Sequence, residues 1–335
     1  MGRRIRPRYR VRPRLFVILG VIVLGAVLLA HHPTQRAARA PLPRRSPPAT
    51  VHVAVPAFGW YPDSLLPSPL QGLAAALAGS DLLVAGGLNA QGSSAAITGF
   101  GPLPVVANLP QPVHDAAAVA IGATLYVLGG GSAAPGAQVQ AVSLNGSAPA
   151  TPPSLPEPLA DMASASTPRG FVVVGGYTGS AYVSTVAVWT PGHLTTLAHL
   201  PLGLRYAAAA WYRNRLVVAG GLSATGPVRS VYAVDLTTGA VSPWPSLPES
   251  VYHAGLAVFD HHLVLVGGEV AGTPVRSVYV YEAASRTWVP GPELPTPTAD
   301  GAVASFQGHL WYIGGFTSSG PTNQVWVAKP LARAH

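Results

Sequence analysis

A glycine doublet closes an apolar run six times along the chain, and this repetition constrains the fold more than any other feature. The doublets lie 43 to 47 residues apart, and a Leu-Pro pair lies 20 residues before each of them. Repeats of 20 to 50 residues are typical of solenoids, propellers and arrays of similar units. The doublets begin at Gly86, Gly129, Gly175, Gly220, Gly267 and Gly314, and the Leu-Pro pairs begin at Leu66, Leu109, Leu155, Leu200, Leu247 and Leu294.

Each repeat has the pattern of four short strands. Small apolar residues follow the Leu-Pro pair, as in 207–211, and a polar turn such as 213–215 leads into the apolar run before the doublet. A polar loop, an alternating run such as 275–282 and a last short apolar run complete the unit. Pro and Gly bracket the Ala-rich runs, which disfavours a helix there. The sequence therefore predicts tandem four-stranded antiparallel units.

These repeats resemble the kelch family. The resemblance rests on the doublet in all six units, a following Tyr and a later Trp, best seen as Tyr279 or Tyr281 and Trp288 in the fifth unit. The second and third units lack a clear Trp in the last strand. The resemblance covers residues 57–331 and implies an all-β, six-bladed β-propeller, in which every blade is a four-stranded meander around a central channel.

The phase of the repeats also predicts how the ring closes. The last doublet is followed by a third strand at 322–329, after which the chain ends without a fourth. An unassigned apolar segment at 57–65, including Trp60, precedes the first Leu-Pro pair. We expect this N-terminal segment to supply the outer strand of the last blade, because an open blade would leave an unpaired edge.

The amino-terminal segment has the pattern of a membrane anchor. Seven Arg residues within 1–14 precede the uncharged run 15–30, and Arg before an apolar run stays in the cytoplasm. We therefore expect a cytoplasmic basic segment at 1–14, a transmembrane signal anchor at 15–30 and a disordered Pro/Arg-rich linker at 31–56. The propeller would then be extracytoplasmic, on a single-pass protein of the cell membrane. Cleavage after Ala38-Arg39-Ala40 and secretion is the alternative.

Charge and composition exclude several classes of protein. Residues 1–50 hold eleven Arg and no acid, whereas 51–335 hold nine basic and twelve acidic residues. The propeller therefore has no basic stripe, and we expect no nucleic-acid partner. The chain has no Cys, which excludes disulfides and Cys-bound zinc. The excess of Arg over Lys, 19 to 1, is typical of a GC-rich genome and suggests a bacterial envelope protein.

Candidate binding residues gather where the innermost strands begin. The fifth and sixth residues after each repeat's Leu enter the innermost strand at the channel mouth, and loops after the doublets meet them there. Polar residues at these places predict a pocket, with Arg205 binding a carboxylate and Tyr206 or Tyr252 stacking on a ring. They could instead tie adjacent blades together through backbone hydrogen bonds. The candidates are His114, Asp115, Asp161, Arg205, Tyr206, Tyr252, His253, Glu269 and Asp300.

Three functions fit these residues. The first is a non-catalytic binding module for an unidentified protein or a cell-surface glycan, without a cofactor or metal. The second is a carbohydrate-active enzyme, because kelch propellers include galactose oxidase and N-acetylneuraminate epimerase. The copper cofactor of galactose oxidase needs a Tyr–Cys crosslink, which a chain without Cys cannot form. An epimerase-like reaction would need His114 or His253 with Asp115 or Asp300 as its acid/base pair. The third function is a passive structural element of the envelope.

Overall fold

The computed structural model describes residues 56–101 and 106–331. The predicted basic segment, transmembrane anchor and linker lie outside these residues, apart from position 56. Within the described part, 31 strands form and no helix is assigned. No helix among these residues is long and apolar enough to cross a membrane. The compact unit 51–335 contains all the described structure.

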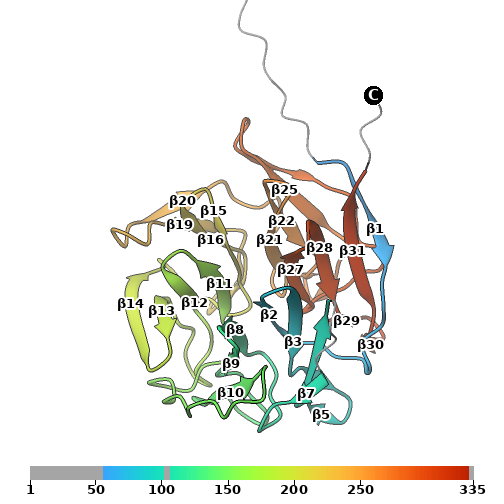
Figure 1. The fold of residues 1–335 in the computed structure, drawn as a ribbon. Coiled ribbons are helices and arrows are strands. Elements are labelled where there is room, and N and C mark those ends of the chain that lie inside the picture. The colour runs from blue at the N-terminus through green and yellow to red at the C-terminus, as the bar shows by residue number, and fades with distance from the viewer. Residues whose placement is uncertain (1–55, 102–105, 332–335) are drawn as a thin grey trace, which may run out of the picture. The chain divides into compact units, whose positions relative to one another are not determined.

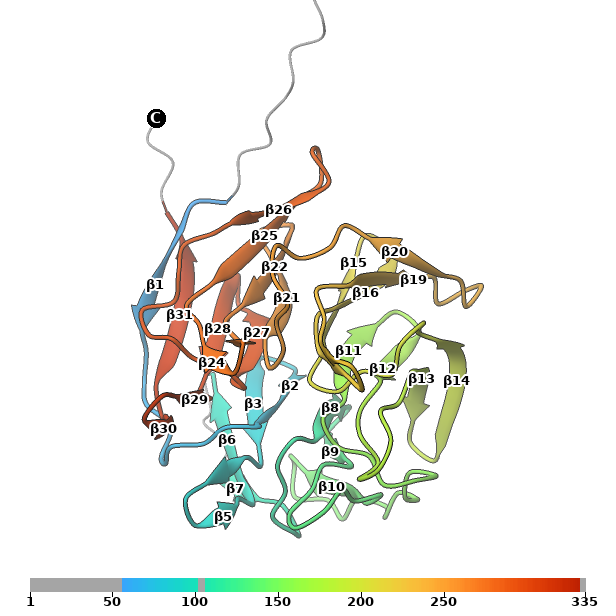
Figure 2. The same cartoon turned by 180° about the vertical axis from the view of Figure 1, so that it is seen from behind.

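Apart from four short hairpins, the strands form six antiparallel sheets around a common channel, which confirms the predicted all-β six-bladed propeller (Figures 1 and 2). In order from the channel outward, the first three blades are β2 (Ala74–Ala78), β3 (Asp81–Ala85), β6 (Ala96–Phe100) and β7 (Val106–Asn108); β8 (Ala117–Ile121), β9 (Thr124–Leu128) and β10 (Val139–Ser143); and β11 (Ala163–Thr167), β12 (Gly170–Val174), β13 (Thr185–Thr190) and β14 (His193–His199).

The last three blades follow the same plan. They are β15 (Ala208–Tyr212), β16 (Arg215–Ala219), β19 (Val231–Val234) and β20 (Val241–Trp244); β21 (Gly255–Phe259), β22 (His262–Val266), β25 (Val278–Glu282) and β26 (Thr287–Pro290); and β27 (Ala302–Phe306), β28 (His309–Ile313), β31 (Val325–Pro330) and β1 (Phe58–Pro62). Short hairpins after four of the doublets are β4 (Leu88–Asn89) with β5 (Gly92–Ser93), β17 (Leu222–Ser223) with β18 (Gly226–Pro227), β23 (Glu269–Val270) with β24 (Thr273–Pro274), and β29 (Phe316–Thr317) with β30 (Gly320–Pro321).

The two sequence markers hold neighbouring blades together. In every doublet the first glycine has φ between 60° and 73°, and an added Cβ would lie 2.1–2.5 Å from a carbonyl oxygen of the next blade. The second glycine donates its N–H to that same carbonyl, as Gly221 does to Val251 O at 2.8 Å. The Leu of every Leu-Pro pair is at most 6% exposed and anchors the core between blades. Both markers recur because every blade junction needs them.

The first strand of the chain completes the last blade. Strand β1 pairs with β31 in antiparallel register, from Phe58 opposite Pro330 to Pro62 opposite Trp326, which is the position that the sequence analysis gives to 57–65. The Trp60 indole donates a hydrogen bond to the Pro292 carbonyl of blade five, at 2.9 Å. Phe58 is buried and packs edge-on against Phe259 of blade five, with 5.4 Å between ring centroids. Strand β1 therefore joins the last two blades.

The prediction of four strands in every blade is wrong for the second blade, where the described residues form three strands. The length of the repeat is not the cause. The segment between the doublet and the next Leu-Pro pair is shorter in the first blade than in the second, and the first blade still forms β7. The segment that follows β10 contains Pro149, Pro152 and Pro153. Proline has no N–H to donate, and of two consecutive prolines one must face the partner strand. The outer edge of β10 is therefore left without a partner strand among the described residues.

Candidate functional site

At the channel mouth, six backbone hydrogen bonds close a ring around the axis. One residue of each blade donates its N–H to the carbonyl oxygen of the corresponding residue of the preceding blade, with N···O distances of 2.8–3.1 Å. The blade-to-blade tie is thus made by backbone groups, which leaves the side chains of these residues available for other contacts. The ring residues are Gly72, Asp115, Asp161, Tyr206, His253 and Asp300.

All six ring residues adopt the left-handed conformation, with φ between 54° and 61°. Glycine and aspartate tolerate this region well, so the backbone alone explains why Gly72 and the three Asp occupy the ring. Bulky residues adopt it rarely, and strained backbone of this kind clusters at functional sites. The conformation therefore does not explain Tyr206, which singles this residue out as a candidate for a binding role.

The carboxyl groups of the ring lie close together. The carboxyl groups of Asp115 and Asp161 come from neighbouring blades, and each influences the protonation of the other. Burial raises the pKa of Asp115 to about 6 and, together with repulsion by Asp115, raises the pKa of Asp161 to about 7. Burial, together with repulsion by Asp115 and Asp161, also raises the pKa of Asp300. The mouth can therefore exchange protons near neutral pH.

Arg205 lies over this acidic ring. Its Nη2 atom is 2.6 Å from Asp161 Oδ2 and donates a hydrogen bond to the Tyr206 hydroxyl. The guanidinium carbon lies 4.5 Å from the ring centroid of Tyr177 and 4.2 Å from that of Tyr206. The Nε atom is buried and has no hydrogen-bond partner among the described residues. Arg205 is held in place and retains an unused donor.

His253 forms a second polar cluster on the other side of Tyr206. Its Nδ1 atom lies 2.7 Å from Glu269 Oε1, and the Tyr252 hydroxyl donates to Glu269 Oε2 at 3.3 Å. A β-bridge between Tyr252 and Glu269 brings this loop to the mouth. The ring centroids of His253 and Tyr206 lie 3.7 Å apart. Glu269 therefore orients the imidazole, in the way that a carboxylate orients a histidine base.

Two small cavities open between these groups. The mouth cavity, of about 100 Å³, is lined by the six ring residues and the residue that follows each of them. The side cavity, of about 200 Å³, is lined by loop 131–135 and by polar and aromatic side chains of blades two to four. The two cavities share Asp115, Asp161 and Tyr206. Besides loop 131–135, the residues that line the side cavity are His114, Asp115, Ala160, Asp161, Tyr177, Arg205 and Tyr206.

The structure brings seven of the nine predicted residues to these cavities. Tyr252 and Glu269 line neither cavity. Glu269 is hydrogen-bonded to both Tyr252 and His253. The Nδ1 atom of His114 forms a hydrogen bond with the Ser93 hydroxyl, at a distance of 2.9 Å. Burial lowers the pKa of His114. Ser93 and loop 131–135 were missed by the sequence analysis, because only the folded ring places these loops beside His114. Within the described residues, no cluster of three or more His, Asp or Glu could hold a metal ion.

Comparison with known proteins identifies one kelch motif and a propeller of similar fold. A family model described as "Kelch motif" matches residues 250–295, the fifth repeat. A solved structure titled "Structure of YjhT" matches with a TM-score of 0.64 and 16% identity, and the match covers 78% of this chain and 96% of that chain. No curated protein matches in sequence. Because 572 chains of solved structure share the fold, the fold by itself does not indicate a function.

Proposed function

We propose that this protein is a membrane-anchored, extracytoplasmic kelch propeller that binds a sugar unit of a cell-surface glycan at its channel mouth. The observation that carries the proposal is Arg205, which lines the side cavity and whose buried Nε donor has no hydrogen-bond partner among the described residues. A hydroxyl or carboxylate oxygen of a ligand would complete this guanidinium fork. Buried donors without a partner are rare in folded proteins and point to a missing acceptor.

The size and lining of the cavities support a small polar ligand. The side cavity and mouth cavity measure about 200 and 100 Å³, each below the range of roughly 300–1,000 Å³ for the pockets of drug-sized ligands, so the ligand must be small. Carboxyl oxygens of Asp115 and Asp161 can accept hydrogen bonds from sugar hydroxyls. The aromatic side chain of Tyr177 lines the same cavity. This combination of acceptors, a cationic donor and an aromatic ring suits a single sugar ring.

The test is a thermal-shift screen of the full-length protein in detergent against neutral and acidic monosaccharides. A ligand at 100 times its Kd adds about 2.7 kcal/mol of stability, which raises the Tm by several degrees. Replacing Arg205 by Ala should abolish the shift, since a hydrogen bond to a charged group contributes about 1.5–3 kcal/mol. Arg229→Ala is the matched control, because Arg229 is exposed and lines neither cavity. A shift that survives Arg205→Ala would place the ligand elsewhere.

The pH dependence of binding distinguishes an acidic sugar from a neutral one. The pKa values of about 6 and 7 mean that the Asp115 and Asp161 carboxyls gain protons as the pH falls through this range. Loss of their negative charge removes repulsion toward an anionic ligand, so its Kd should decrease at least tenfold between pH 8 and pH 5.5. A neutral sugar should bind almost equally at both pH values. Titration calorimetry at the two pH values measures the difference.

A proton-transfer enzyme acting on a carbohydrate is the second candidate. The Asp115–Asp161 pair favours it, because general acid/base groups work best with pKa values near the operating pH. The contact of Glu269 with His253 also favours it, because a carboxylate can orient an imidazole for proton transfer. His253→Asn tests it, since Asn also tolerates a left-handed backbone. If a sugar found in the screen is converted, detected by NMR, the variant should lower kcat at least 100-fold. If that sugar binds but is not converted, the enzyme is excluded and the binding module remains as the proposed function.

The proposed location rests on the Arg-rich segment 1–14 and the apolar run 15–30. Because the chain has no Cys, a single introduced thiol reports its side of the membrane without background. Thr238→Cys, in an exposed turn of blade four, should react with a membrane-impermeant maleimide on intact cells. Pro7→Cys should react only after lysis. Labelling of Pro7→Cys on intact cells would overturn the orientation, and labelled protein in the medium would indicate the secreted form.

A further inference from the structure

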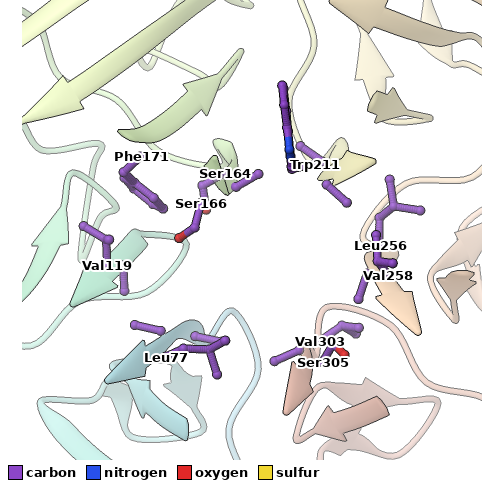
Figure 3. A pocket seen from close by; sticks show the side chains of 18 residues that line it. Leu77, Val119, Ser164, Ser166, Phe171, Trp211, Leu256, Val258, Val303 and Ser305 are labelled. Carbon is purple, nitrogen blue, oxygen red and sulfur yellow. The ribbon is translucent and has the colours of Figure 1, made fainter. Parts of the chain in front are cut away.

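A cavity of about 160 Å³ lies within blade three, away from the channel. Figure 3 shows the channel, which is lined mainly by the inner strands, including the labelled residues Ser164 and Trp211. The blade-three cavity lies instead among β12, β13, β14 and the segment 155–159 that leads into the blade. It shares no residue with the channel, the mouth cavity or the side cavity.

Blade five fills the corresponding space with a tyrosine. Residues 155–189 of blade three align with 247–281 of blade five without a gap, because the Leu-Pro pair and the doublet have the same spacing in both. Ala187 then takes the place of Tyr279. The strand ladders agree with this alignment, since each of the two residues lies opposite the second residue before its doublet. Ala187 lines the blade-three cavity, which is therefore the space left by a missing tyrosine ring.

In blade five an acidic residue holds this tyrosine. The Tyr279 hydroxyl donates a hydrogen bond to Glu249 Oε1 at 2.8 Å, and the Ser277 hydroxyl donates to the same oxygen at 3.2 Å. Burial and the hydrogen bond to Glu249 raise the pKa of Tyr279 to about 12, so its hydroxyl remains a donor at neutral pH. Blade three keeps the counterparts of both partners, Glu157 and Thr185, and both line its cavity.

Blade three combines these features in a way that no other repeat does. Of the six repeats, only the third and the fifth have a glutamate directly after the Leu-Pro pair. At the position opposite the second residue before the doublet, blade three has the smallest side chain of the six. The residues at that position are Thr98, Gln140, Ala187, Tyr232, Tyr279 and Trp326. Blade three therefore keeps an acceptor for a phenol hydroxyl but lacks the ring.

The size and the lining of the blade-three cavity suit one aromatic ring. Its volume of about 160 Å³ is close to that of apolar cavities of roughly 150 Å³ that bind benzene. Leu159, Val173 and Ala187 are buried and give the cavity an apolar inner wall. Glu157 is exposed and provides a carboxylate at the outer end. An apolar wall with one charged acceptor selects an aromatic molecule that carries a hydroxyl group.

The direction of the ring distinguishes a free phenol from a tyrosine of a partner protein. A ring whose hydroxyl donates to the exposed Glu157 directs its para carbon inward, toward the buried Ala187. The side chain of a tyrosine is joined to its backbone through this para carbon. A tyrosine that enters from solvent would thus point its hydroxyl away from Glu157. The orientation excludes a partner's tyrosine and favours a small molecule.

We propose that the blade-three cavity binds a small free phenol, whose ring occupies the place of the missing tyrosine and whose hydroxyl donates to Glu157. This proposal does not depend on the function proposed for the mouth, because the sites share no residue. It also differs in chemistry, since the mouth offers several carboxyl groups and Arg205, whereas this cavity offers an apolar wall with a single carboxylate.

The experiment titrates the full-length protein in detergent with 3-fluorophenol at pH 7, followed by ¹⁹F NMR. The matched probe is 1,3-difluorobenzene, which has fluorine in place of the hydroxyl and should bind at least fivefold more weakly, because it cannot donate a hydrogen bond. Glu157→Ala should weaken the binding of 3-fluorophenol at least fivefold and leave that of 1,3-difluorobenzene unchanged. This variant should fold normally, since Glu157 is exposed. N-acetyl-3-fluorotyrosinamide should not bind.

Filling the cavity should remove the site. Ala187→Tyr supplies the ring that blade five has, and it should reduce binding of 3-fluorophenol to the level seen with detergent alone. Thr195→Tyr is the matched control, because Thr195 is exposed on β14 and does not line the cavity, and it should bind like the wild-type protein.

Three results would overturn the proposal. They are the absence of 3-fluorophenol binding to the wild-type protein, unchanged binding in Ala187→Tyr, and unchanged binding in Glu157→Ala. Binding of N-acetyl-3-fluorotyrosinamide with a similar Kd would overturn the choice of a free phenol, because a partner's tyrosine could then occupy the cavity.

Discussion

Deleting residues 57–65 is expected to lower the Tm by more than 10 °C and to broaden the unfolding transition. The deletion removes β1, its ladder with β31, the buried side chain of Phe58 and the partly buried side chain of Trp60. Truncating a buried Phe or Trp alone costs about 3–5 kcal/mol. The last blade would keep three strands, and its junction with blade five would lose the Trp60 indole. Scanning calorimetry of the full-length protein and the deletion variant measures the difference.

Point variants within β1 separate the loss of packing from the loss of chain. Phe58→Ala should reproduce a large part of the loss, because this ring packs between blades five and six. Tyr61→Ala is the matched control on the same strand and should cost less than about 1 kcal/mol, since Tyr61 is exposed. An unchanged Tm in the deletion variant would mean that β1 does not stabilise the closed ring.

Gly220→Ala is expected to destabilise the protein by about 3 kcal/mol or more. The residue has φ +63°, and an added Cβ would lie 2.4 Å from Val251 O of the next blade. That carbonyl accepts the hydrogen bond from Gly221, so moving it away would break the junction. Backbone strain of this kind costs about 1–3 kcal/mol, and overpacking adds a similar amount. Urea unfolding followed by Trp fluorescence measures the change in the free energy of unfolding.

Two further glycines divide the effect into its causes. Gly226→Ala, at φ +120° with open space around it, should show the cost of the backbone conformation alone. Gly136 has no positive φ, and the nearest atom to its added Cβ lies 3.5 Å away, so Gly136→Ala should be almost neutral. If Gly220→Ala cost no more than Gly226→Ala, the close approach of the next blade would not explain the doublet.

The repeat markers made the propeller predictable because they report backbone requirements. Gly220 cannot carry a side chain at a blade junction, and Leu247 must fill the core beside it, so both recur in phase. The three-stranded second blade was missed because the repeat length suggested a complete unit. Its cause, the consecutive Pro152 and Pro153, acts on one strand only and leaves the spacing of the markers unchanged.

The candidate site could be predicted in position but not in chemistry. Counting from the Leu-Pro pairs identified the ring positions of Asp115 and Asp161, because every repeat enters the channel at the same point. The contact of Arg205 with Asp161 joins two blades, and the raised pKa of the Asp161 carboxyl depends on burial. Neither property follows from spacing within one repeat. They arise only when the six inner strands converge.

The pairing of β1 with β31 also sets a limit on when the protein can finish folding. Trp60 and its partner Ala328 are 268 residues apart, so β1 leaves the ribosome long before its partner strand exists. At about 5–20 residues per second, synthesis of the intervening chain takes roughly 13–54 s. During that time β1 carries Phe58 and Trp60 without their partners in the last two blades. The ring therefore closes only after β31 has been synthesised, and until then β1 has an unpaired edge of the kind that promotes aggregation.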